Sequence, residues 1–427
     1  IYNAGTITKN STAGTSTIGA NINFVNSGVL DASVGTLQYN SSNTFNSGTT
    51  FTGNGLNYVP GSVTFSVPVT LDGSLQTGTL NLATGGSLTG IGNLDVTTNY
   101  NPTGGTLGTT FHDLSLTSSG NFPAGDFTAT NFLELRAPSG SISGGRNLTA
   151  PSIRLEASTG IGATGNAVNT FASNLEFNEV TSDVVILNDK ATGLTEVGSH
   201  AGTGNVSISE QSGSMTVGAA GIELAGLLPL NLSTLSSGKS ITIASGVGIL
   251  NQTQGGPVNL KADDFDIQGP ISLAVGAGSR TVTLLPATSG TPITLGTGAG
   301  GIVLSSAELG RISATNLNIG DTSSGAITVN DTIFVTNTPN LSLYTGDAIG
   351  SLPGGAIVVP GLALSSVNGT LMDNGNNVST FYGTNTGTGD LAFYTNNGGS
   401  PMSVHASNTA PGGKVIIFSP ALDALYS

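Results

Sequence analysis

The chain of 427 residues contains no cysteine and no tryptophan, and it has few charges of either sign. Without cysteine it can form no disulfide, zinc–thiolate centre or thiol nucleophile. The chain has only 10 lysines and arginines but 24 aspartates and glutamates, and no lysine or arginine lies between Lys9 and Arg136. Nucleic acids and anionic membrane surfaces are bound by clustered basic side chains. The net charge of −14 therefore predicts no nucleic acid partner.

Long hydrophobic runs are also missing. The most apolar stretch, 222–232, is short and is broken by Gly226 and Pro229, whereas a membrane-spanning helix needs about 20 apolar residues. We therefore predict no insertion into a membrane. No signal peptide is recognisable, and the chain starts inside a repeat-like segment at 3–7. We expect it to be a piece, or a processed form, of a longer protein.

A short frame recurs along the chain: a small residue, any residue, Asn, Ser or Asp, and then apolar–any–apolar. Its copies are Ala150–Leu155, Ala172–Phe177, Ala262–Ile267 and Ala314–Ile319, with looser copies at Thr338–Leu343 and Val359–Leu364. The clearest direct repeat pairs Leu133–Gly140 with Ile153–Gly160, which begins 20 residues later. Self-similarity at such a period is typical of a solenoid.

Apolar–any–apolar triplets provide the secondary-structure signal. Their middle residue is usually Ser, Thr or Asn, an alternation of period two that indicates strands with one buried face. Between the triplets lie Gly, Asn, Ser, Asp and Pro, the residues that tight turns need. No segment has helical periodicity over three turns, and the best candidate, 305–309, is at most one turn. The positive mean hydropathy of +0.17 argues against disorder.

Short, closely spaced strands are also typical of sandwiches and barrels. Here the repeat stays in phase over a long stretch, the strands are very short, and the chain is too long for one sandwich. We therefore predict an all-β chain folded as a right-handed parallel β-helix (β-solenoid), with about 20–25 residues per coil and roughly 17–21 coils. At about 4.8 Å per coil, such a rod is on the order of 80–100 Å long.

The repeat changes its style along the chain. Segments of the form Asn-x-Gly recur at 3–7, 26–30 and 46–50, whereas the Ala-x-Asn frame takes over from about residue 129. We predict one β-solenoid section over 1–125 and a second over 126–427. A single continuous rod with drifting sequence is the alternative.

The titratable residues give no reactive constellation. His112, His200 and His405 are far apart in sequence and have no partners at metal-ligand spacing. Paired carboxylates can act as acid and base, and the only acidic cluster is 263–266. There the frame directs Phe265 and Ile267 inward and Asp264 and Asp266 outward, with Asp263 at the preceding turn. The His-Gly and Arg-x-Lys motifs of pectin-degrading β-helices are absent, so we expect a solvated coil face or a weak calcium contact.

The glycine motifs are also uninformative. The GxGxxG match at 160–165 needs a helix after it to bind a dinucleotide, and no helix is predicted there. Segment 238–240 resembles the end of a phosphate loop, but Ser233 occupies the position of its first glycine. Half of a calcium-binding nonapeptide occurs at 387–391, but only once. Thr-x-Thr pairs, which could form an ice-binding array, occur without a constant period. We predict no catalytic, cofactor-binding or metal-ligating residue and no enzymatic activity.

Segments 314–320, 295–302 and 173–177 resemble the repeats of filamentous-haemagglutinin-like exoproteins. These are large β-helical proteins that Gram-negative bacteria export by two-partner secretion, and their repeats are similar to those of autotransporter passengers. The resemblance covers 125–427 well and 1–125 in style only. It implies adhesion, biofilm matrix or fibre formation, and it transfers no catalytic residue. The family's N-terminal secretion domain, with its Asn-Pro-Asn-Gly-type motif, is absent, which would make this a shaft segment.

The function expected from these observations is mechanical: the shaft of an extracellular adhesin or surface fibre on a bacterium. Expected partners are a host-cell or matrix glycan or protein receptor, and neighbouring repeats or copies of the chain end to end. One alternative is a polysaccharide-binding or polysaccharide-cleaving β-helix, for which Tyr382, Phe393 and Tyr394 near Asp390 are candidates, although Phe393 is more typical of a core. The other is a self-assembling filament or sheath subunit.

Overall fold

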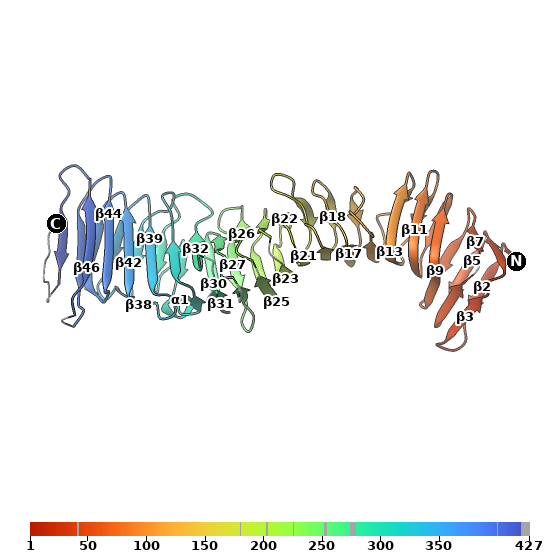
Figure 1. Ribbon diagram of the computed structural model, residues 1–427, viewed down its shortest axis with the longest axis horizontal. Helices are drawn as coiled ribbons and strands as arrows, with labels where there is room; N and C mark the ends of the chain where they lie inside the picture. Colours follow the sequence, from red (N-terminus) through yellow and green to blue (C-terminus); the bar gives the residue numbers. More distant parts are fainter. Residues whose placement is uncertain are drawn as a thin grey trace. The chain divides into compact units, whose positions relative to one another are not determined.

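The computed structural model describes residues 1–40, 42–179, 181–201, 204–224, 226–251, 254–273, 279–398 and 400–419. It divides into two compact units, Ile1–Asn188 and Asp189–Ser427. Each unit is a stack of short parallel strands (Figure 1). The predicted all-β parallel solenoid is therefore confirmed, and the described residues form about 19 turns.

The strands of the first unit form four sets of parallel neighbours. One set is β1 (Tyr2–Asn3), β4 (Asn23–Asn26) and β7 (Ser42–Phe45). The second is β2 (Thr6–Lys9), β5 (Val29–Ala32), β8 (Thr50–Thr52), β10 (Pro68–Leu71), β12 (Ser87–Thr89) and β14 (Thr106–Leu107). The third is β3 (Thr15–Ile18), β6 (Thr36–Tyr39), β9 (Leu56–Phe65), β11 (Ser74–Ala83), β13 (Asn93–Thr103), β15 (Asp113–Thr117), β17 (Phe132–Ala137), β19 (Ser152–Ala157) and β21 (Asn174–Glu179). The fourth is β16 (Phe127–Thr128), β18 (Asn147–Thr149), β20 (Val168–Phe171) and β22 (Val184–Asn188).

The second unit repeats this plan. One set is β23 (Leu194–Ala201), β25 (Met215–Leu224), β27 (Ser240–Ile243), β28 (Ile249–Asn251), β30 (Asp264–Ile267), β31 (Ile271–Leu273) and β35 (Ile312–Ser313). Another is β24 (Val206–Glu210), β26 (Leu230–Thr234), β29 (Val258–Lys261), β32 (Thr281–Leu285), β36 (Asn316–Ile319), β39 (Asn340–Tyr344), β42 (Gly361–Ser366), β44 (Thr380–Asn385) and β46 (Ser403–Asn408). A third is β33 (Ile293–Leu295), β34 (Ile302–Leu304), β37 (Ile327–Val329), β40 (Ile349–Ser351), β43 (Thr370–Asn376), β45 (Leu391–Thr395) and β47 (Val415–Phe418). A pair, β38 (Thr332–Phe334) and β41 (Ala356–Val358), and one helix, α1 (Ser306–Leu309), complete the unit.

The direct repeat seen in the sequence is a strand-to-strand register. Leu133 pairs with Ile153, and Ile153 pairs with Leu175, so these two coils are 20 and 22 residues long. Along β19 the residues alternate between half-buried and buried. The frame thus places its two apolar residues inside and its middle residue outside, as predicted, because successive side chains of a strand point to opposite faces.

Aromatic side chains fill the interior near the start of the first unit. Phe24, Tyr39, Phe45, Phe51 and Phe65 are all buried and contact one another with ring centroids 5.2–6.5 Å apart. Most of these pairs are edge-to-face, an arrangement that aromatic quadrupoles favour. The Tyr39 hydroxyl donates to Asn57 Oδ1 at 2.8 Å, so the one polar atom in the cluster has a partner.

Buried asparagines hold the turns from inside. Asn385 is fully buried, accepts from the Gly369 N–H, and donates to the carbonyls of Thr388 and Gly389 at 2.8 and 3.0 Å. Asn188 bonds both backbone groups of Ala172 in the same way. Both asparagines therefore bond mainly to backbone groups of the turns. This satisfies amide groups that water cannot reach.

Within the first unit one set of strands is replaced by another near residue 110. The set containing β12 ends with β14 at Leu107, and the set containing β18 begins with β16 at Phe127, while β13, β15 and β17 stay paired throughout. The predicted sections, 1–125 and 126–427, describe a change of repeat style, which is a separate question from the packing division at residue 188.

Candidate functional sites on the coil surface

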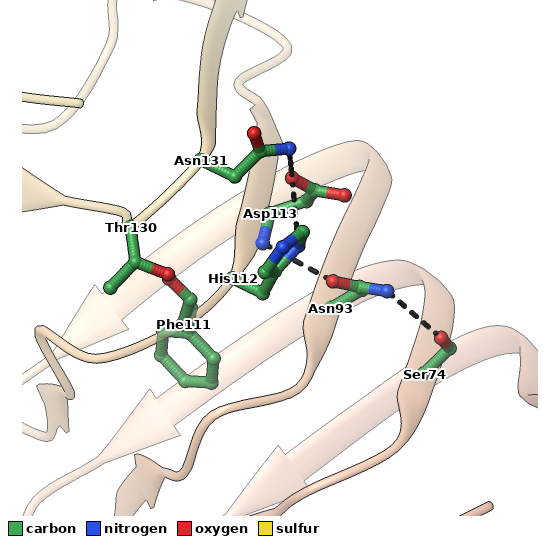
Figure 2. A network of polar contacts seen from close by, with 7 residues as sticks. All are labelled: Ser74, Asn93, Phe111, His112, Asp113, Thr130 and Asn131. Carbon is green, nitrogen blue, oxygen red and sulfur yellow. Dashed lines mark hydrogen bonds and ion pairs between the residues drawn. The ribbon is translucent and has the colours of Figure 1, made fainter. Parts of the chain in front are cut away.

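The first candidate is a polar network around His112, at the corner that leads into β15 (Figure 2). His112 Nδ1 lies 3.3 Å from Asp113 Oδ1, and Asn131 Nδ2 donates to the same oxygen at 2.7 Å. The Asp113 N–H donates to Asn93 Oδ1 at 3.2 Å, and Asn93 Nδ2 donates to Ser74 Oγ. The network therefore links four successive coils through their corners.

This network offers little chemistry beyond that linkage. The His112 and Asp113 side chains are 57% and 38% exposed, so solvent screens their interaction. The nearby Thr130 hydroxyl donates to the Phe111 carbonyl and is not directed at the imidazole. Phe111 itself is fully buried and anchors the corner. We interpret the pair as part of a solvent-exposed corner of the coil.

The other two histidines lie elsewhere. His200 is part of β23, but its side chain lies outside the described residues. His405 lies on β46 and stacks against Tyr382, with centroids 4.8 Å apart and ring planes 10° from parallel. Within the described part of the chain, no three His, Asp or Glu side chains are grouped so as to hold a metal ion.

Asp263 corrects the expectation of a solvated acidic face at 263–266. Its side chain is only 8% exposed. It accepts hydrogen bonds from the Gly238 N–H at 2.8 Å, from the Thr288 N–H and hydroxyl at 2.7 and 2.6 Å, and from the Thr291 hydroxyl at 3.2 Å. Burial by itself raises the pKa of Asp263, but these hydrogen bonds outweigh it and hold the pKa below its usual value. Asp263 therefore has a structural role: it joins neighbouring coils through hydrogen bonds.

The remainder of the cluster follows the prediction. Phe265 and Ile267 are buried, Asp264 is exposed, and Asp266 is half-buried and accepts from Gln268 Nε2 at 2.6 Å. The carboxylates on one strand thus point outward, while Asp263 at the preceding turn points away from them. The structure does not bring Asp263 together with Asp264 and Asp266 as an acid–base site.

The glycine motifs are turns. Strand β20, not a helix, follows the GxGxxG match at 160–165, as predicted. At 238–240 the Gly238 N–H is already bound by Asp263, and Ser240 begins β27. In segment 387–391, Gly389 has a φ of 78° and Asp390 Oδ1 accepts from the Lys414 N–H at 2.8 Å. Polar groups of these loops are therefore already hydrogen-bonded to neighbouring coils.

A small cavity of about 290 Å³ lies beside Arg146, between 124–126 and 143–146. Arg146 is only 3% exposed, and its guanidinium donates to the carbonyls of Ser143, Pro123 and Phe122. No sequence motif indicated that this arginine is buried. Since its donors are directed at backbone oxygens, the residue closes a turn and is not available to a ligand.

The aromatic residues proposed for a polysaccharide site are separated by the fold. Phe393 is fully buried against Phe381, with centroids 4.0 Å apart, as its apolar frame indicated. Tyr394 contacts Phe418 on the strands β45 and β47. Tyr382 lies on β44 and is 51% exposed. The structure pairs Tyr382 with His405 of the next coil, a contact that no sequence motif indicated.

Tyr382 also borders a shallow groove of about 470 Å³ that crosses β39, β42 and β44. These strands lie side by side at the blue end of the ribbon (Figure 1). The groove is lined by uncharged residues, among them Asn340, Ser342, Gly361, Ala363 and Thr380.

The chain matches no protein-family model, no curated protein and no solved structure. None of the helices in the described residues has the length and apolar character needed to cross a membrane. The fold class is thus established by the coordinates, and the resemblance to filamentous-haemagglutinin-like exoproteins stays a prediction.

Proposed function

We propose that this chain is the structural shaft of an extracellular bacterial adhesin or surface fibre, with a mechanical and not an enzymatic role. The observation that carries the proposal is the coil-to-coil ladder. In both units, strand after strand pairs in parallel with the equivalent strand of the next coil. A stack whose repeats contact only their neighbours can be lengthened coil by coil without redesign of the remainder. Such a stack is suited to hold a binding module at a distance.

The packing of the coils also supports a load-resistant element. The inward residues of β17 and β19, such as Leu133, Leu135 and Leu155, are fully or almost fully buried, and each lies over its counterpart in the next coil. Separating two coils therefore exposes apolar surface and breaks backbone hydrogen bonds at the same time. Both costs rise with the length of the paired strands.

The outer surface suits an aqueous exterior. Charged residues make up only 8% of the chain, and the outward positions are mostly Ser, Thr and Asn. Asn231 donates to Asn205 Oδ1 at 3.1 Å, and Asn259 donates to Asn231 Oδ1 at 2.9 Å, so neighbouring coils are also joined on the outside by amides. The proposed partners are a glycan or protein receptor on a host cell or matrix, and neighbouring repeats of the same fibre.

Immunogold electron microscopy of the producing cells tests this function directly. Antibodies raised against the purified chain should label thin fibres attached to intact, unpermeabilised cells, and labelling should disappear when the gene is deleted. Label confined to the cell interior contradicts an extracellular shaft. If the purified chain grows into fibres without other components, the self-assembling filament or sheath subunit replaces the tethered shaft.

A polysaccharide-binding role is the second candidate function. The groove beside Tyr382 is the specific observation that favours it. A shaft with such a groove could hold matrix glycan along its side, so the two roles are compatible. The groove is developed below as a site in its own right.

A further inference from the structure

One face of the second unit is free of charge over six successive coils. The strands β32, β36, β39, β42, β44 and β46 contain no Asp, Glu, Lys or Arg. They pair in parallel, so their outward side chains align in columns along the stack. In a chain with a net charge of −14, this face is the part best suited to a neutral ligand.

The groove on this face arises from missing side-chain volume on β42. In the central column, Ser342 on β39 is followed by Ala363 on β42 and then by Tyr382 on β44. In the next column Gly361 occupies β42, where an added Cβ would lie 2.5 Å from Asn340 Oδ1. Two small residues thus form a floor, and Tyr382 stands beside it.

Hydroxyl groups around this floor are available. Asn340 Nδ2 is bound to Asn316 Oδ1 and to the Thr315 carbonyl, which fixes the orientation of the amide. By contrast, among the described residues the hydroxyls of Ser342, Thr380 and Tyr382 have no hydrogen-bond partner. They can exchange water for a ligand's hydroxyls without breaking a bond within the protein.

The Tyr382 ring stacks on one neighbour outside the strand, and the adjacent residue Phe381 is packed inside it. On the outside it stacks on His405 of the next coil. On the inside, Phe381 stacks on Phe393, and Gly383 makes room for this pair, because an added Cβ would lie 2.8 Å from Phe381 Cζ and 2.9 Å from Leu391 Cδ1. A ring fixed in this way loses little conformational entropy when a ligand packs against it.

We propose that this groove binds a neutral, linear polysaccharide that runs along the coil axis, with a sugar ring stacked beside Tyr382. Sugar rings present apolar C–H faces to an aromatic ring and hydroxyls at their edges, which matches one tyrosine surrounded by hydroxyl and amide groups. Successive coils are about 4.8 Å apart, close to the length of one pyranose in an extended chain. Each further sugar therefore meets the next coil of the same uncharged face.

Direct binding of oligosaccharides to the full chain tests the proposal. Cellohexaose, xylohexaose and mannohexaose are titrated by calorimetry, with hexagalacturonate as the charged comparison. We expect at least one neutral hexasaccharide to bind and hexagalacturonate to bind at least about tenfold more weakly, since no cation lies on the face to pair with its carboxylates. The proposal is wrong if no neutral hexasaccharide binds. It is also wrong if hexagalacturonate binds as tightly as the neutral hexasaccharides.

Two pairs of variants locate the site. Ala363→Leu fills the floor and should weaken binding by about tenfold or more, whereas Ser365→Leu on the same face of β42, outside the groove, should change it by less than about twofold. Tyr382→Ala should weaken binding by about tenfold and Tyr382→Phe by less, because the stacking face is kept. Equal binding by Ala363→Leu and the parent chain overturns the site.

Amide hydrogen exchange at Phe381 and Leu391 keeps these tests independent of folding. Protection equal to that of the parent chain shows that the coil is intact, so a loss of binding then reports on the groove. A negative binding result leaves the shaft function untouched, since that function is tested by labelling of fibres on cells and not by affinity for a sugar.

Discussion

At the scale of single residues, the polar groups with the largest structural role are buried ones that accept several hydrogen bonds. Asp263 receives four, from Gly238, Thr288 and Thr291. A buried donor that loses its partner keeps the cost of desolvation without compensation. The residue therefore joins three coils through its hydrogen bonds.

Asp263→Ala should destabilise the surrounding coils by about 1–3 kcal/mol at neutral pH, because it leaves buried donors without an acceptor. The pKa of Asp263 is lowered in the folded protein, so its stabilisation is complete above the carboxyl's ordinary pKa of about 3.9 and is lost as the pH falls toward the folded value. The difference from the parent chain should shrink in acid.

Hydrogen exchange at the Gly238 and Thr288 amides, followed from neutral to acidic pH, measures this effect. Asp266→Ala is the matched control, because Asp266 is half-buried and, among the described residues, its carboxylate accepts a hydrogen bond only from the Gln268 side chain. It should change stability by less than about 0.5 kcal/mol. Equal effects of the two substitutions would show that the contacts of Asp263 are not structural.

At the scale of elements, the inward and outward faces of a strand contribute unequally to the stability of the fold. On β19, Leu155 is fully buried, while Arg154 lies outside, 3.5 Å from Glu134 and 3.7 Å from Glu176 in the flanking coils. The Arg154 side chain is 41% exposed. Exposed ion pairs contribute little because water and salt screen them.

Leu155→Ala should therefore cost about 2–5 kcal/mol, through lost apolar burial and the cavity left behind. Arg154→Ala, the adjacent residue on the same strand, should cost about 1 kcal/mol or less. Chemical denaturation followed by circular dichroism compares the two. A larger effect for Arg154 would mean that the charge ladder, and not the interior, holds these coils in register.

The single helical turn α1 is stabilised by its own cap. Glu308 Oε2 accepts from the Ser305 N–H and hydroxyl at 2.9 and 2.7 Å, the Ser305 hydroxyl accepts from the Glu308 N–H, and Glu308 Oε1 accepts from the Ile267 N–H of a neighbouring coil. This is a capping box with an added bond to the stack.

Glu308→Ala should destabilise this turn by about 1 kcal/mol, and Glu308→Gln should retain most of the stability, because an amide oxygen can still accept from the backbone. Exchange rates of the Ser305 and Ile267 amides report the effect locally. Unchanged exchange in the alanine variant would mean that packing of the buried Leu309 alone holds α1 in place.

At the scale of the whole molecule, stability depends on nearest-neighbour stacking within each unit. Such a chain need not unfold in one step, because each coil is supported mainly by the coils beside it. Basic residues are few, and several of the 10 lie within strands, such as Arg136 on β17 and Arg154 on β19. Protease cleavage requires local unfolding of the segment that is cut.

The folded chain should therefore survive trypsin for hours, with early cuts confined to exposed turns such as the one at Lys414. Electrophoresis and mass spectrometry identify the cuts, and the heat-denatured chain is the control that shows the sites to be cleavable. Rapid digestion of the folded chain to small peptides would contradict a stable stack of coils.

The sequence by itself determined the architecture. The frame that recurs at 150–155, 172–177, 262–267 and 314–319 assigned inward and outward positions correctly, because coil stacking is a local, repeated relation between one strand and the next. The local sequence also predicted at most one helical turn at 305–309 and a core position for Phe393, and both predictions are confirmed.

Only the tertiary structure decided which surface side chains meet. Tyr382 and His405 are 23 residues apart, and Asp263 and Thr288 are 25 apart, yet each pair is in contact. Paired positions on β29 and β32 are 24 residues apart, whereas those on β32 and β36 are 35 apart. Because coil length varies through the turns, the period fixes which face a residue occupies but not its neighbour one coil away. The groove beside Tyr382 and the burial of Asp263 depend on that register, which exists only once the coils have stacked.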